Sequence, residues 1–207
     1  ATPLLIACRN GHLDIVRLLL EAGAAVNQAK PNGATPLLIA CRNGHLDFVR
    51  LLLEAGAALD RAKPNGATPL LAACHNGHLE IARLLLEAGA AVNQAGEDGV
   101  TPLLIACQEG HVECSRLLLE AGAAIDQAYA EGVTPLSAAS QEGKIDCVRL
   151  MITAGAAVNQ ADSDGFTPLY AACQEGQLEC AELHLEAGAA MDQATQDGAT
   201  PLFVACQ

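Results

Sequence analysis

The sequence predicts an all-α repeat solenoid, a stack of helical units without a single central core. The triplet Thr-Pro-Leu returns every 33 residues, at positions 2, 35, 68, 101, 134, 167 and 200. A fixed period without insertions means that one supersecondary unit stacks on copies of itself. The composition agrees, because the chain is 51% hydrophobic but only 2% aromatic. Such a chain favours thin units that pack through small side chains.

The repeat register also predicts the domain organisation. We expect one array over residues 1–207, with six full units and a partial seventh. The units are 2–34, 35–67, 68–100, 101–133, 134–166, 167–199 and the partial unit 200–207. Repeat arrays usually need terminal units with polar outer faces, and the partial unit has no second helix. We therefore expect either an excised piece of a longer array or end-to-end contacts between molecules.

The first half of each unit reads as a turn followed by a short helix. Asn32-Gly33 is a turn signal, because Gly tolerates positive φ. Thr35 suits the N-cap position, and Pro36 suits the first helical position. Gly44 ends this helix as a left-handed cap. Thr-Pro recurs in all seven units and the two Gly positions recur in the six full units, so the same short helix is predicted throughout.

The second half of each unit reads as a longer amphipathic helix, here residues 45–55. Asp47 lies in its first turn, where a carboxylate interacts favourably with the helix dipole. Its apolar stripe consists of Leu46, Val49, Leu52 and Leu53. Gly56 ends the helix, and an extended link over residues 57–61 leads to the next turn. Two such helices bury their apolar faces only by stacking on neighbouring units.

This unit resembles the ankyrin repeat. The shared features are the period of 33, Thr-Pro-Leu, Gly44-His45, Leu52-Leu53 and Gly56-Ala57, and they cover essentially the whole chain. The resemblance implies ankyrin-type helix–turn–helix units with projecting β-turn or hairpin loops. It also implies that partners contact a concave groove made by the turn tips and the exposed side of the first helices.

Two columns depart from the family pattern. The His that follows Thr-Pro-Leu in the family is replaced by Leu5, Leu38, Leu71, Leu104, Ser137, Tyr170 and Phe203. The Asp of the family's Gly-Ala-Asp-Val-Asn is replaced by Ala25, Ala58, Ala91, Ala124, Ala157 and Ala190. Both changes make the surface more apolar than the family average. They affect the surface that would meet a partner, and they leave the fold prediction unchanged.

The charge is strongly acidic and unevenly distributed. The net charge is −13, which disfavours nucleic-acid partners because phosphates would be repelled. Residues 1–99 hold 8 Lys/Arg and 9 Asp/Glu, whereas residues 100–207 hold 3 and 15. No apolar run reaches the length of about 18 residues that a membrane span needs. The predicted groove thus changes from weakly basic to acidic near residue 96, and a membrane partner is not expected.

The nine cysteines lie in two repeating apolar columns. The first-helix column holds Cys8, Cys41, Cys74, Cys107, Cys173 and Cys206, with Ser140 in the gap, and the second-helix column holds Cys114, Cys147 and Cys180. Neighbouring units are about 8–10 Å apart, too far for same-column disulfides, which need about 7 Å or less. No Cys-x₂₋₄-Cys pair suggests zinc. We expect buried free thiols, a cytoplasmic or other reducing intracellular compartment and no metal. Cys107–Cys114 and Cys173–Cys180 are the same-unit pairs whose separation needs checking.

Two further columns have both structural and functional interpretations. His12, His45, His78 and His111 share one column, and the family resemblance implies that they bond to the backbone between helices. His75 and His184 are isolated and carry no prediction. Asn27, Asn93 and Asn159 occur in Val-Asn contexts that, in the family, can be substrates of an asparaginyl hydroxylase. The acidic residue favoured two positions earlier is absent, so a structural role in the link is the alternative.

No catalytic constellation is visible. The acids fall in periodic columns at the two ends of the second helices, where solubility and helix-dipole effects explain them. The sequence has no paired-carboxylate site, no nucleophile with a partnered base and no phosphate loop. We therefore predict a protein that is not an enzyme and needs no cofactor.

The candidate binding residues lie where packing does not dictate identity. Aromatic residues gather in the last 80 positions, together with acids that precede the Gly-His column or lie at turn tips. Aromatic side chains often anchor protein interfaces. The predicted partner-binding residues are Tyr129, Phe166, Tyr170, Phe203, Glu109, Glu142, Glu175, Asp164, Arg9 and Arg42. The alternative is that the aromatics fill gaps between units and the acids only solubilise.

The sequence favours a protein–protein interaction scaffold that binds a basic protein or peptide in its concave groove. One alternative is a regulatory or targeting array that belongs to a larger enzyme or channel and docks within it. Another is a designed or consensus-like array, because the copies are so alike. Nine unpaired cysteines argue against deliberate design.

Overall fold

The structure is a computed structural model that describes residues 2–96 and 99–206. It divides into two compact units, Ala1–Asp98 and Gly99–Gln207. The N-terminal unit contains α1 (Pro3–Asn10), α2 (Leu13–Glu21), α3 (Pro36–Asn43), α4 (Leu46–Glu54), α5 (Pro69–His75) and α6 (Leu79–Glu87). The C-terminal unit contains α7 (Pro102–Glu109), α8 (Val112–Glu120), the 3₁₀ turn η1 (Ala130–Gly132), α9 (Pro135–Gln141), α10 (Ile145–Thr153), α11 (Pro168–Gln174), α12 (Leu178–Glu186) and α13 (Pro201–Ala205).

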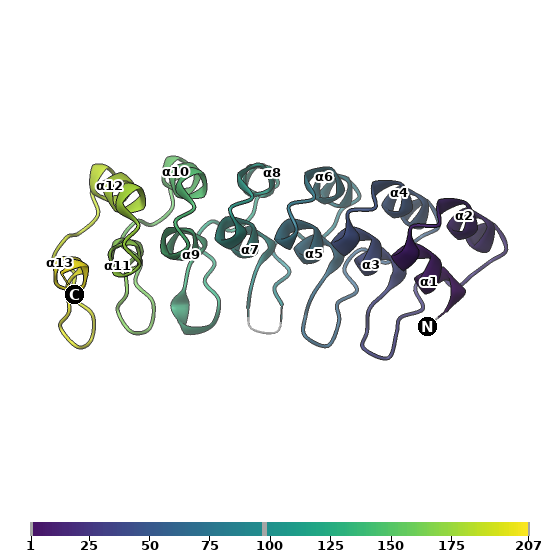
Figure 1. The fold of residues 1–207 in the computed structure, drawn as a ribbon, viewed down its shortest axis with the longest axis horizontal. Coiled ribbons are helices and arrows are strands. Elements are labelled where there is room, and N and C mark those ends of the chain that lie inside the picture. Colours follow the sequence, from purple (N-terminus) through teal and green to yellow (C-terminus); the bar gives the residue numbers. More distant parts are fainter. Residues whose placement is uncertain (1, 97–98, 207) are drawn as a thin grey trace. The chain divides into compact units, whose positions relative to one another are not determined.

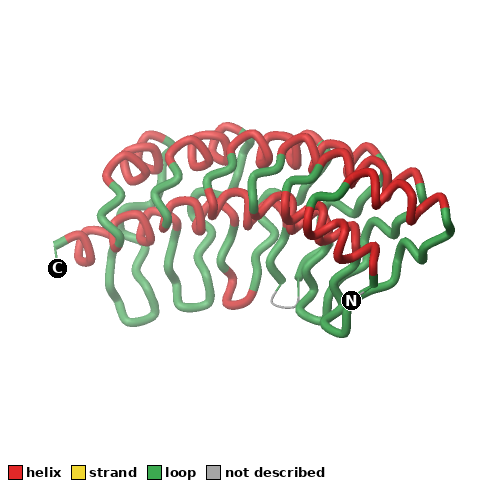
Figure 2. The backbone as a smooth tube through the Cα atoms, turned by 45° about the vertical axis from the view of Figure 1, so that its right-hand side comes forward, coloured by secondary structure: helices red, strands yellow, loops and turns green. Residues whose placement is uncertain are grey.

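Within each unit the helices form two rows (Figure 1). The first helices of successive repeats form one row, and the second helices form the other, with long turns projecting from the row of first helices. Only helices and loops occur in the described residues (Figure 2). This arrangement confirms the predicted all-α solenoid of helix–turn–helix units.

The Thr-Pro-Leu triplet is the start of each first helix. Thr35 lies at the N-cap, and its hydroxyl accepts a hydrogen bond from the backbone N–H of Leu38 at 3.2 Å. The same bond recurs in each repeat, from Leu5 to Thr2, Leu71 to Thr68, Leu104 to Thr101, Ser137 to Thr134, Tyr170 to Thr167 and Phe203 to Thr200. Each cap contributes about 1 kcal/mol, which explains why such short helices form.

The helix ends also follow the predicted pattern, with small shifts. Gly44 closes α3 in the left-handed conformation at φ 76°. The second helix α4 spans Leu46–Glu54, one residue shorter at each end than predicted, because His45 and Ala55 adopt cap conformations. A one-residue difference at a helix end is ordinary.

The core of each unit is a ladder of small and branched side chains between helices. In the N-terminal unit, α1 packs on α3 and α3 on α5, while α2 packs on α4 and α4 on α6. Leu5, Ala34, Leu38 and Ile39 form a buried cluster that joins the first two repeats. In the C-terminal unit, the first helices pack in the order α7, α9, α11, α13, and the second helices pack in the order α8, α10, α12.

An alternating Asn/Asp column ties neighbouring repeats together. The side-chain oxygen of Asn27 accepts the N–H of Ala58 at 2.8 Å, 31 residues later. The same bond is made by Asp60 with Ala91, Asp126 with Ala157 and Asn159 with Ala190. Asn and Asp can both make this bond because it needs only a side-chain oxygen acceptor. This common role explains why the column tolerates the alternation.

The turn tips of the C-terminal unit are linked by backbone hydrogen bonds. Ser163 donates its N–H to the carbonyl of Glu131 at 2.6 Å, and Gln196 donates its N–H to the carbonyl of Asp164 at 3.0 Å. Glu131 has φ 67°, and it is the one non-Gly residue with positive φ among the described positions. The left-handed region costs such a residue roughly 1–2 kcal/mol.

Replacing Glu131 by Gly should therefore raise the free energy of unfolding by about 0.5–1 kcal/mol, because the strain outweighs the larger entropy that Gly loses on folding. Urea unfolding followed by circular dichroism measures this change. Glu131→Gln is the control, since it removes the charge but keeps the Cβ atom. A gain of equal size in Glu131→Gln would contradict the strain argument.

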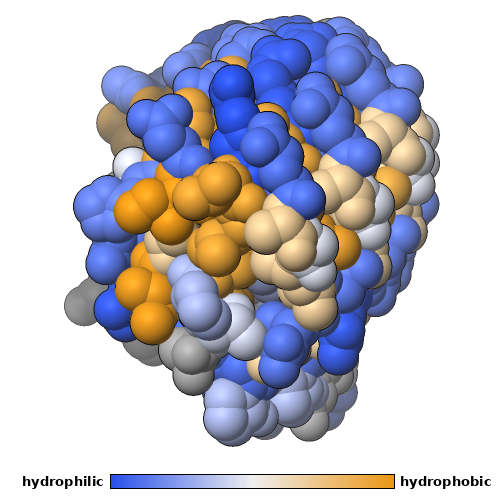
Figure 3. Space-filling view, turned by 90° about the vertical axis from the view of Figure 1, so that its right-hand side faces the viewer, coloured by the Kyte–Doolittle hydropathy of each residue, from blue (hydrophilic) through white to orange (hydrophobic). Residues whose placement is uncertain are grey.

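The outermost repeats expose apolar side chains. At the N-terminal end, Ile6, Ile15 and Leu18 are 42%, 48% and 65% exposed. Figure 3 looks onto this end and shows an apolar patch surrounded by polar residues. The corresponding positions of the next repeat, such as Ile39 and Phe48, are buried. The patch is therefore the face on which, elsewhere in the unit, a preceding repeat packs.

Candidate functional site

Two of the predicted aromatic anchors form a stacked pair. The rings of Phe166 and Tyr170 lie 4.7 Å apart between centroids with an interplanar angle of 11°. Tyr170 is buried at 7% exposure, whereas Phe166 is half-buried. A stacked pair gains about 0.5–1.5 kcal/mol beyond the area that it buries. Tyr170 is thus the buried ring of the stacked pair, and Phe166 is the ring that a partner can reach.

The other two aromatic residues lie apart from this pair. Tyr129 is half-buried at the turn before α9, and its N–H and carbonyl bond to Val133 and Gly132. Phe203 lies on α13 and is 57% exposed. The structure therefore brings together two of the four predicted aromatic residues and leaves the others at separate places.

Phe166 lines a groove between the last two complete repeats. The groove has a volume of 150 Å³ and is lined by residues from α9, α11 and the turns that precede them, namely Val133, Ser137, Gln141, Asp162, Phe166, Ala171, Gln174 and Glu175. Two of these residues are acidic and none is basic. The groove thus combines the Phe166 ring, the apolar side chains of Val133 and Ala171, and two carboxylates.

The carboxylate of Asp162 also holds the turn in place. One of its oxygens accepts the N–H groups of Asp164 at 3.0 Å and Phe166 at 2.9 Å. This bonding fixes the backbone on which the Phe166 ring is carried. Asp164 itself is exposed at the turn tip.

The three predicted glutamates occupy equivalent exposed positions. Glu109 ends α7, and Glu142 and Glu175 are the C-cap residues of α9 and α11. All three are exposed, and they recur along the row of first helices in the C-terminal unit. This unit holds 3 Lys/Arg against 15 Asp/Glu. Its row of first helices therefore carries an acidic edge.

The two predicted arginines belong to the other unit. Arg9 and Arg42 lie in the last turns of α1 and α3, where both are exposed. Arg9 Nε donates to the Asn10 side chain at 3.4 Å. Each unit is a compact body of its own, so these arginines form a separate candidate surface in the N-terminal unit.

The cysteines form no disulfides, and most are buried. All nine lie in the described residues and none is bridged, including those of the two same-unit pairs considered from the sequence, Cys107–Cys114 and Cys173–Cys180. Seven are buried, Cys173 is half-buried and Cys206 is exposed. Burial raises the pKa of Cys8 to about 11, which keeps this thiol protonated and unreactive at neutral pH.

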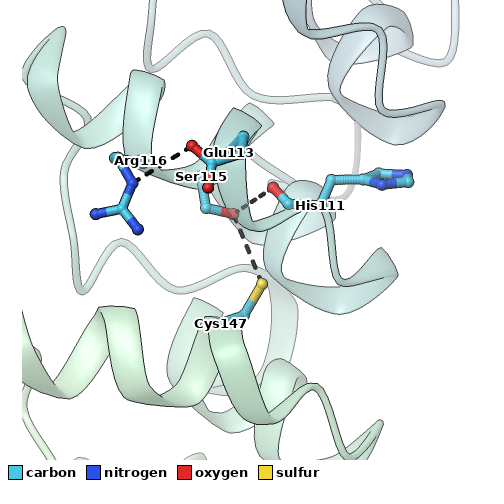
Figure 4. A network of polar contacts seen from close by, with 5 residues as sticks. All are labelled: His111, Glu113, Ser115, Arg116 and Cys147. Carbon is cyan, nitrogen blue, oxygen red and sulfur yellow. Dashed lines mark hydrogen bonds and ion pairs between the residues drawn. The ribbon is translucent and has the colours of Figure 1, made fainter.

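One cysteine cluster contains a polar contact that the sequence columns do not suggest. Ser115 Oγ donates to the carbonyl of His111 at 3.2 Å and lies 4.0 Å from Cys147 Sγ (Figure 4). Cys107 Sγ donates to the same hydroxyl at 3.5 Å. Hydrogen bonding with Cys107 lowers the pKa of Cys147. In the same view, Arg116 and Glu113 form an exposed ion pair at 3.5 Å.

A second buried polar pair joins α9 to α12. Ser140 Oγ lies 2.7 Å from His184 Nε2 and donates its own hydrogen to the carbonyl of Leu136 at 2.7 Å. His184 Nε2–H therefore donates to Ser140, and Nδ1 is left as a buried nitrogen without a partner in the described residues. Both side chains are 0% exposed. This Ser–His pair has no access to a substrate and is a feature of the core.

At His78 the histidine column makes the backbone hydrogen bond that the family resemblance implies. His78 Nε2 donates to the carbonyl of Arg42 in the preceding repeat at 3.2 Å. Gln177 occupies the same column and donates to the carbonyl of Gln141 at 3.4 Å. Each of these side chains thus bonds to the last turn of the first helix in the preceding repeat.

The asparagine column has a clear structural role. Both polar side-chain atoms of Asn27 form hydrogen bonds. Nδ2 donates to the Gly56 carbonyl at 3.3 Å, and Oδ1 accepts from the N–H of Ala58. Asn159 accepts from Ala190 at 2.8 Å. These bonds support the structural interpretation, and hydroxylation of Asn27, Asn93 or Asn159 stays a prediction.

In residues 2–96 and 99–206, no group of three or more His, Cys, Asp or Glu side chains could hold a metal ion. Within the same ranges, no helix has the length and apolar character needed to cross a membrane.

The repeated helix pairs define a helical-repeat protein. The family model of ankyrin repeats matches three times, at residues 1–63, 56–129 and 122–194. The chain therefore belongs to the ankyrin repeat family, whose members are generally protein–protein interaction modules.

A solved structure supports this assignment. The crystal structure of the human ASB11 ankyrin repeat domain is similar to the chain with a TM-score of 0.92 and 32% sequence identity. The similarity covers 99% of this chain and 92% of that chain. In a comparison with curated protein sequences, none matches the chain.

Proposed function

We propose that the chain is a non-catalytic interaction scaffold and that its C-terminal unit binds a basic segment of a partner protein. The groove at Phe166 carries this proposal, because an accessible aromatic ring and two carboxylates line the same hollow. A Lys or Arg side chain fits such a site, since its charge interacts with carboxylates and with an aromatic face. The supporting ring of Tyr170 fixes the position of Phe166.

The acidic edge extends this site along the unit. Glu109, Glu142 and Glu175 recur at one position of successive first helices. A basic segment that follows the row of first helices meets one carboxylate per repeat. Such an arrangement adds attraction at each step and accelerates the first encounter.

Neutralising this edge should weaken binding of a basic peptide about tenfold. Each exposed carboxylate contributes about 0.2–1 kcal/mol to binding. The affinity of the triple variant Glu109→Gln, Glu142→Gln and Glu175→Gln for the peptide should therefore fall about tenfold. The probe is a capped, fluorescently labelled peptide of five Lys-Ala pairs, and fluorescence anisotropy measures its affinity. The corresponding Glu-Ala peptide should not bind.

A matched variant separates the site from the overall charge. Glu120→Gln, Asp146→Asn and Glu186→Gln remove the same number of exposed charges from the second helices α8, α10 and α12. We expect this variant to bind the Lys-Ala peptide within about twofold of the unchanged chain. Equal losses in the two triple variants would show that net charge alone attracts the peptide. The variant Phe166→Ala should also lose affinity, because the aromatic wall is removed.

A further inference from the structure

All Asn-Gly dipeptides of the chain lie in the N-terminal unit. They are Asn10-Gly11, Asn32-Gly33, Asn43-Gly44, Asn65-Gly66 and Asn76-Gly77. In such a dipeptide the backbone nitrogen of Gly can attack the side-chain amide carbon of the preceding Asn, because Gly has no side chain to block the approach. The product is a cyclic imide, which water opens to Asp or isoaspartate. The surroundings of each pair determine whether it is placed to react.

Exposure and the hydrogen bonds of the glycines do not separate the five pairs. All five Asn residues are exposed. The Gly N–H donates to a backbone carbonyl at every pair, from Gly11 to Ala7, Gly33 to Lys30, Gly44 to Cys41, Gly66 to Lys63 and Gly77 to Cys74. The pairs differ instead in the N–H group of the residue that follows the Gly.

At the three helix ends this N–H group closes the helix. His12, His45 and His78 donate to the carbonyls of Ala7, Ala40 and Ala73 at 3.1, 3.0 and 3.0 Å. Asn10 and Asn43 are the last residues of α1 and α3. The side chain of Asn76 is turned back onto its helix, where Nδ2 donates to the carbonyl of Ala72 at 2.8 Å. Attack on these amides therefore requires that the helix end opens first.

At the two turn tips the same N–H group holds the Asn side chain. Ala34 donates its N–H to Asn32 Oδ1 at 3.3 Å, and Ala67 donates its N–H to Asn65 Oδ1 at 3.4 Å. Asn side chains commonly bond to the backbone two residues later in turns. This bond closes a ring of atoms that contains both the side-chain amide carbon and the Gly nitrogen. The two atoms that react are thus held within one small ring.

The bond also lies where the reaction develops charge. When the Gly33 nitrogen adds to the amide carbon of Asn32, negative charge grows on Oδ1, to which the N–H of Ala34 already donates. A donor placed at a developing oxyanion lowers the barrier, and so does a fixed geometry of the reacting atoms. We propose that Asn32 and Asn65 are the sites of spontaneous deamidation in this chain, and that the fold protects the three helix-end Asn residues. The proposal does not depend on the proposed binding function.

The conversion is a hydrolysis in which only water is consumed. The Gly33 nitrogen gives its proton to water or hydroxide and forms a bond to the amide carbon of Asn32. The bond from this carbon to Nδ2 breaks, and Nδ2 takes up a proton and leaves as ammonia. Water then adds to one of the two carbonyls of the imide and opens the ring. In total, one amide and one water become one carboxylic acid and one ammonia, with no change of oxidation state.

The two products affect the turn tip differently. Asp adds a negative charge before the Gly, as Asp164 and Asp197 do at the equivalent positions of the C-terminal unit. Isoaspartate also adds a methylene group to the backbone. Gly33 is already packed on the next turn, since a Cβ atom there would lie 2.6 Å from Pro64 Cδ and 3.1 Å from Lys63 Cα. Deamidation at Asn32 therefore changes both the charge of the tip and its contact with the next tip.

Isotope labelling during storage tests the proposal. The folded full chain is kept in mildly alkaline buffer made with water enriched in a heavy oxygen isotope, and peptide mapping by mass spectrometry follows all five pairs. Each conversion incorporates one oxygen atom from water. We expect Asn32 and Asn65 to convert at least about tenfold faster than Asn10, Asn43 and Asn76, because poor alignment of reacting atoms costs a factor of this size or more.

Two controls make the test decisive. Asn32→Gln should abolish fast labelling at its own position, because Gln needs a larger ring, whereas Asn43→Gln should leave labelling at Asn32 and Asn65 unchanged. In the urea-unfolded chain all five pairs lose their surroundings, so their rates should become similar. Equal rates at the five pairs in the folded chain, or faster conversion at the helix ends, would overturn the proposal. So would a folded chain that stays unlabelled at Asn32 and Asn65 while the unfolded chain is labelled, since the turn would then protect the amide.

Discussion

Replacing His184 by Leu is expected to raise the free energy of unfolding by about 1–3 kcal/mol at pH 7. The substitution removes a buried nitrogen that lacks a hydrogen-bond partner, and such a group costs about this much. The site accepts a Leu side chain, because the equivalent Leu118 and Met151 are fully buried. Ser140 stays bonded to the carbonyl of Leu136, so no new unsatisfied group is created.

The gain should be larger in acid. Burial lowers the pKa of His184 from 6.5 to about 4. Below pH 6.5 the unfolded chain takes up a proton that the folded chain accepts only near pH 4. The folded state is thus destabilised progressively from pH 6.5 to 4, by at most about 3 kcal/mol in total. His184→Leu removes this loss, so the difference between variant and unchanged chain should grow as the pH falls through this window.

Urea unfolding at pH 7.5, 6 and 5 measures this difference, and the comparison cancels the titration of the surface carboxylates. Ser140→Cys is the control. It restores the cysteine of the repeat but keeps His184, so it should retain the full acid sensitivity and lose stability. An acid dependence that is the same in His184→Leu and in the unchanged chain would show that His184 does not titrate in this window.

The fold could be predicted because its signals are local and repeated. The Thr cap, the Pro that follows it and the left-handed Gly act within a few residues of the chain, and each occurs in every full repeat. Thr35, Pro36 and Gly44 lie where the sequence places them. Repetition makes these weak local signals reliable, because an error at one turn does not change the repeat boundaries that the other copies indicate.

The candidate site was harder to predict because it depends on contacts between columns. Tyr170 follows the Thr-Pro-Leu triplet, which suggests an exposed position, but its ring stacks on Phe166 and is buried. His184 looks isolated in the sequence, yet it occupies the leucine column of the second helix and bonds to Ser140, 44 residues earlier. Ser140 and His184 each break their own column, and they lie in neighbouring repeats. Two such breaks that coincide in neighbouring repeats are a signal that a column-by-column comparison could detect.

The close approach of successive turn tips leads to a second strong expectation. Replacing Gly132 by Ala should lower the free energy of unfolding by about 3 kcal/mol. Gly132 has φ 90°, and a Cβ atom there would lie 3.0 Å from the Cα atom of Asp162 and 3.2 Å from the nitrogen of Ser163. The left-handed conformation costs Ala roughly 1–2 kcal/mol, and displacement of neighbouring backbone adds about 1–3 kcal/mol. Backbone cannot move aside as a flexible side chain can.

Gly122→Ala separates these two contributions. Gly122 has φ 86°, but a Cβ atom there would meet nothing within 4 Å. This variant should therefore lose only about 1 kcal/mol, because conformational strain is partly offset by the reduced entropy of the unfolded chain. In Gly132→Ala, amide exchange at Ser163 should also accelerate, since its N–H bonds to the carbonyl of Glu131 beside the new methyl group. Equal stability losses in the two variants, with Ser163 unaffected, would mean that the turn tips are not held in close contact. The binding surface at Phe166 would then lack the rigid support that its stacked ring requires.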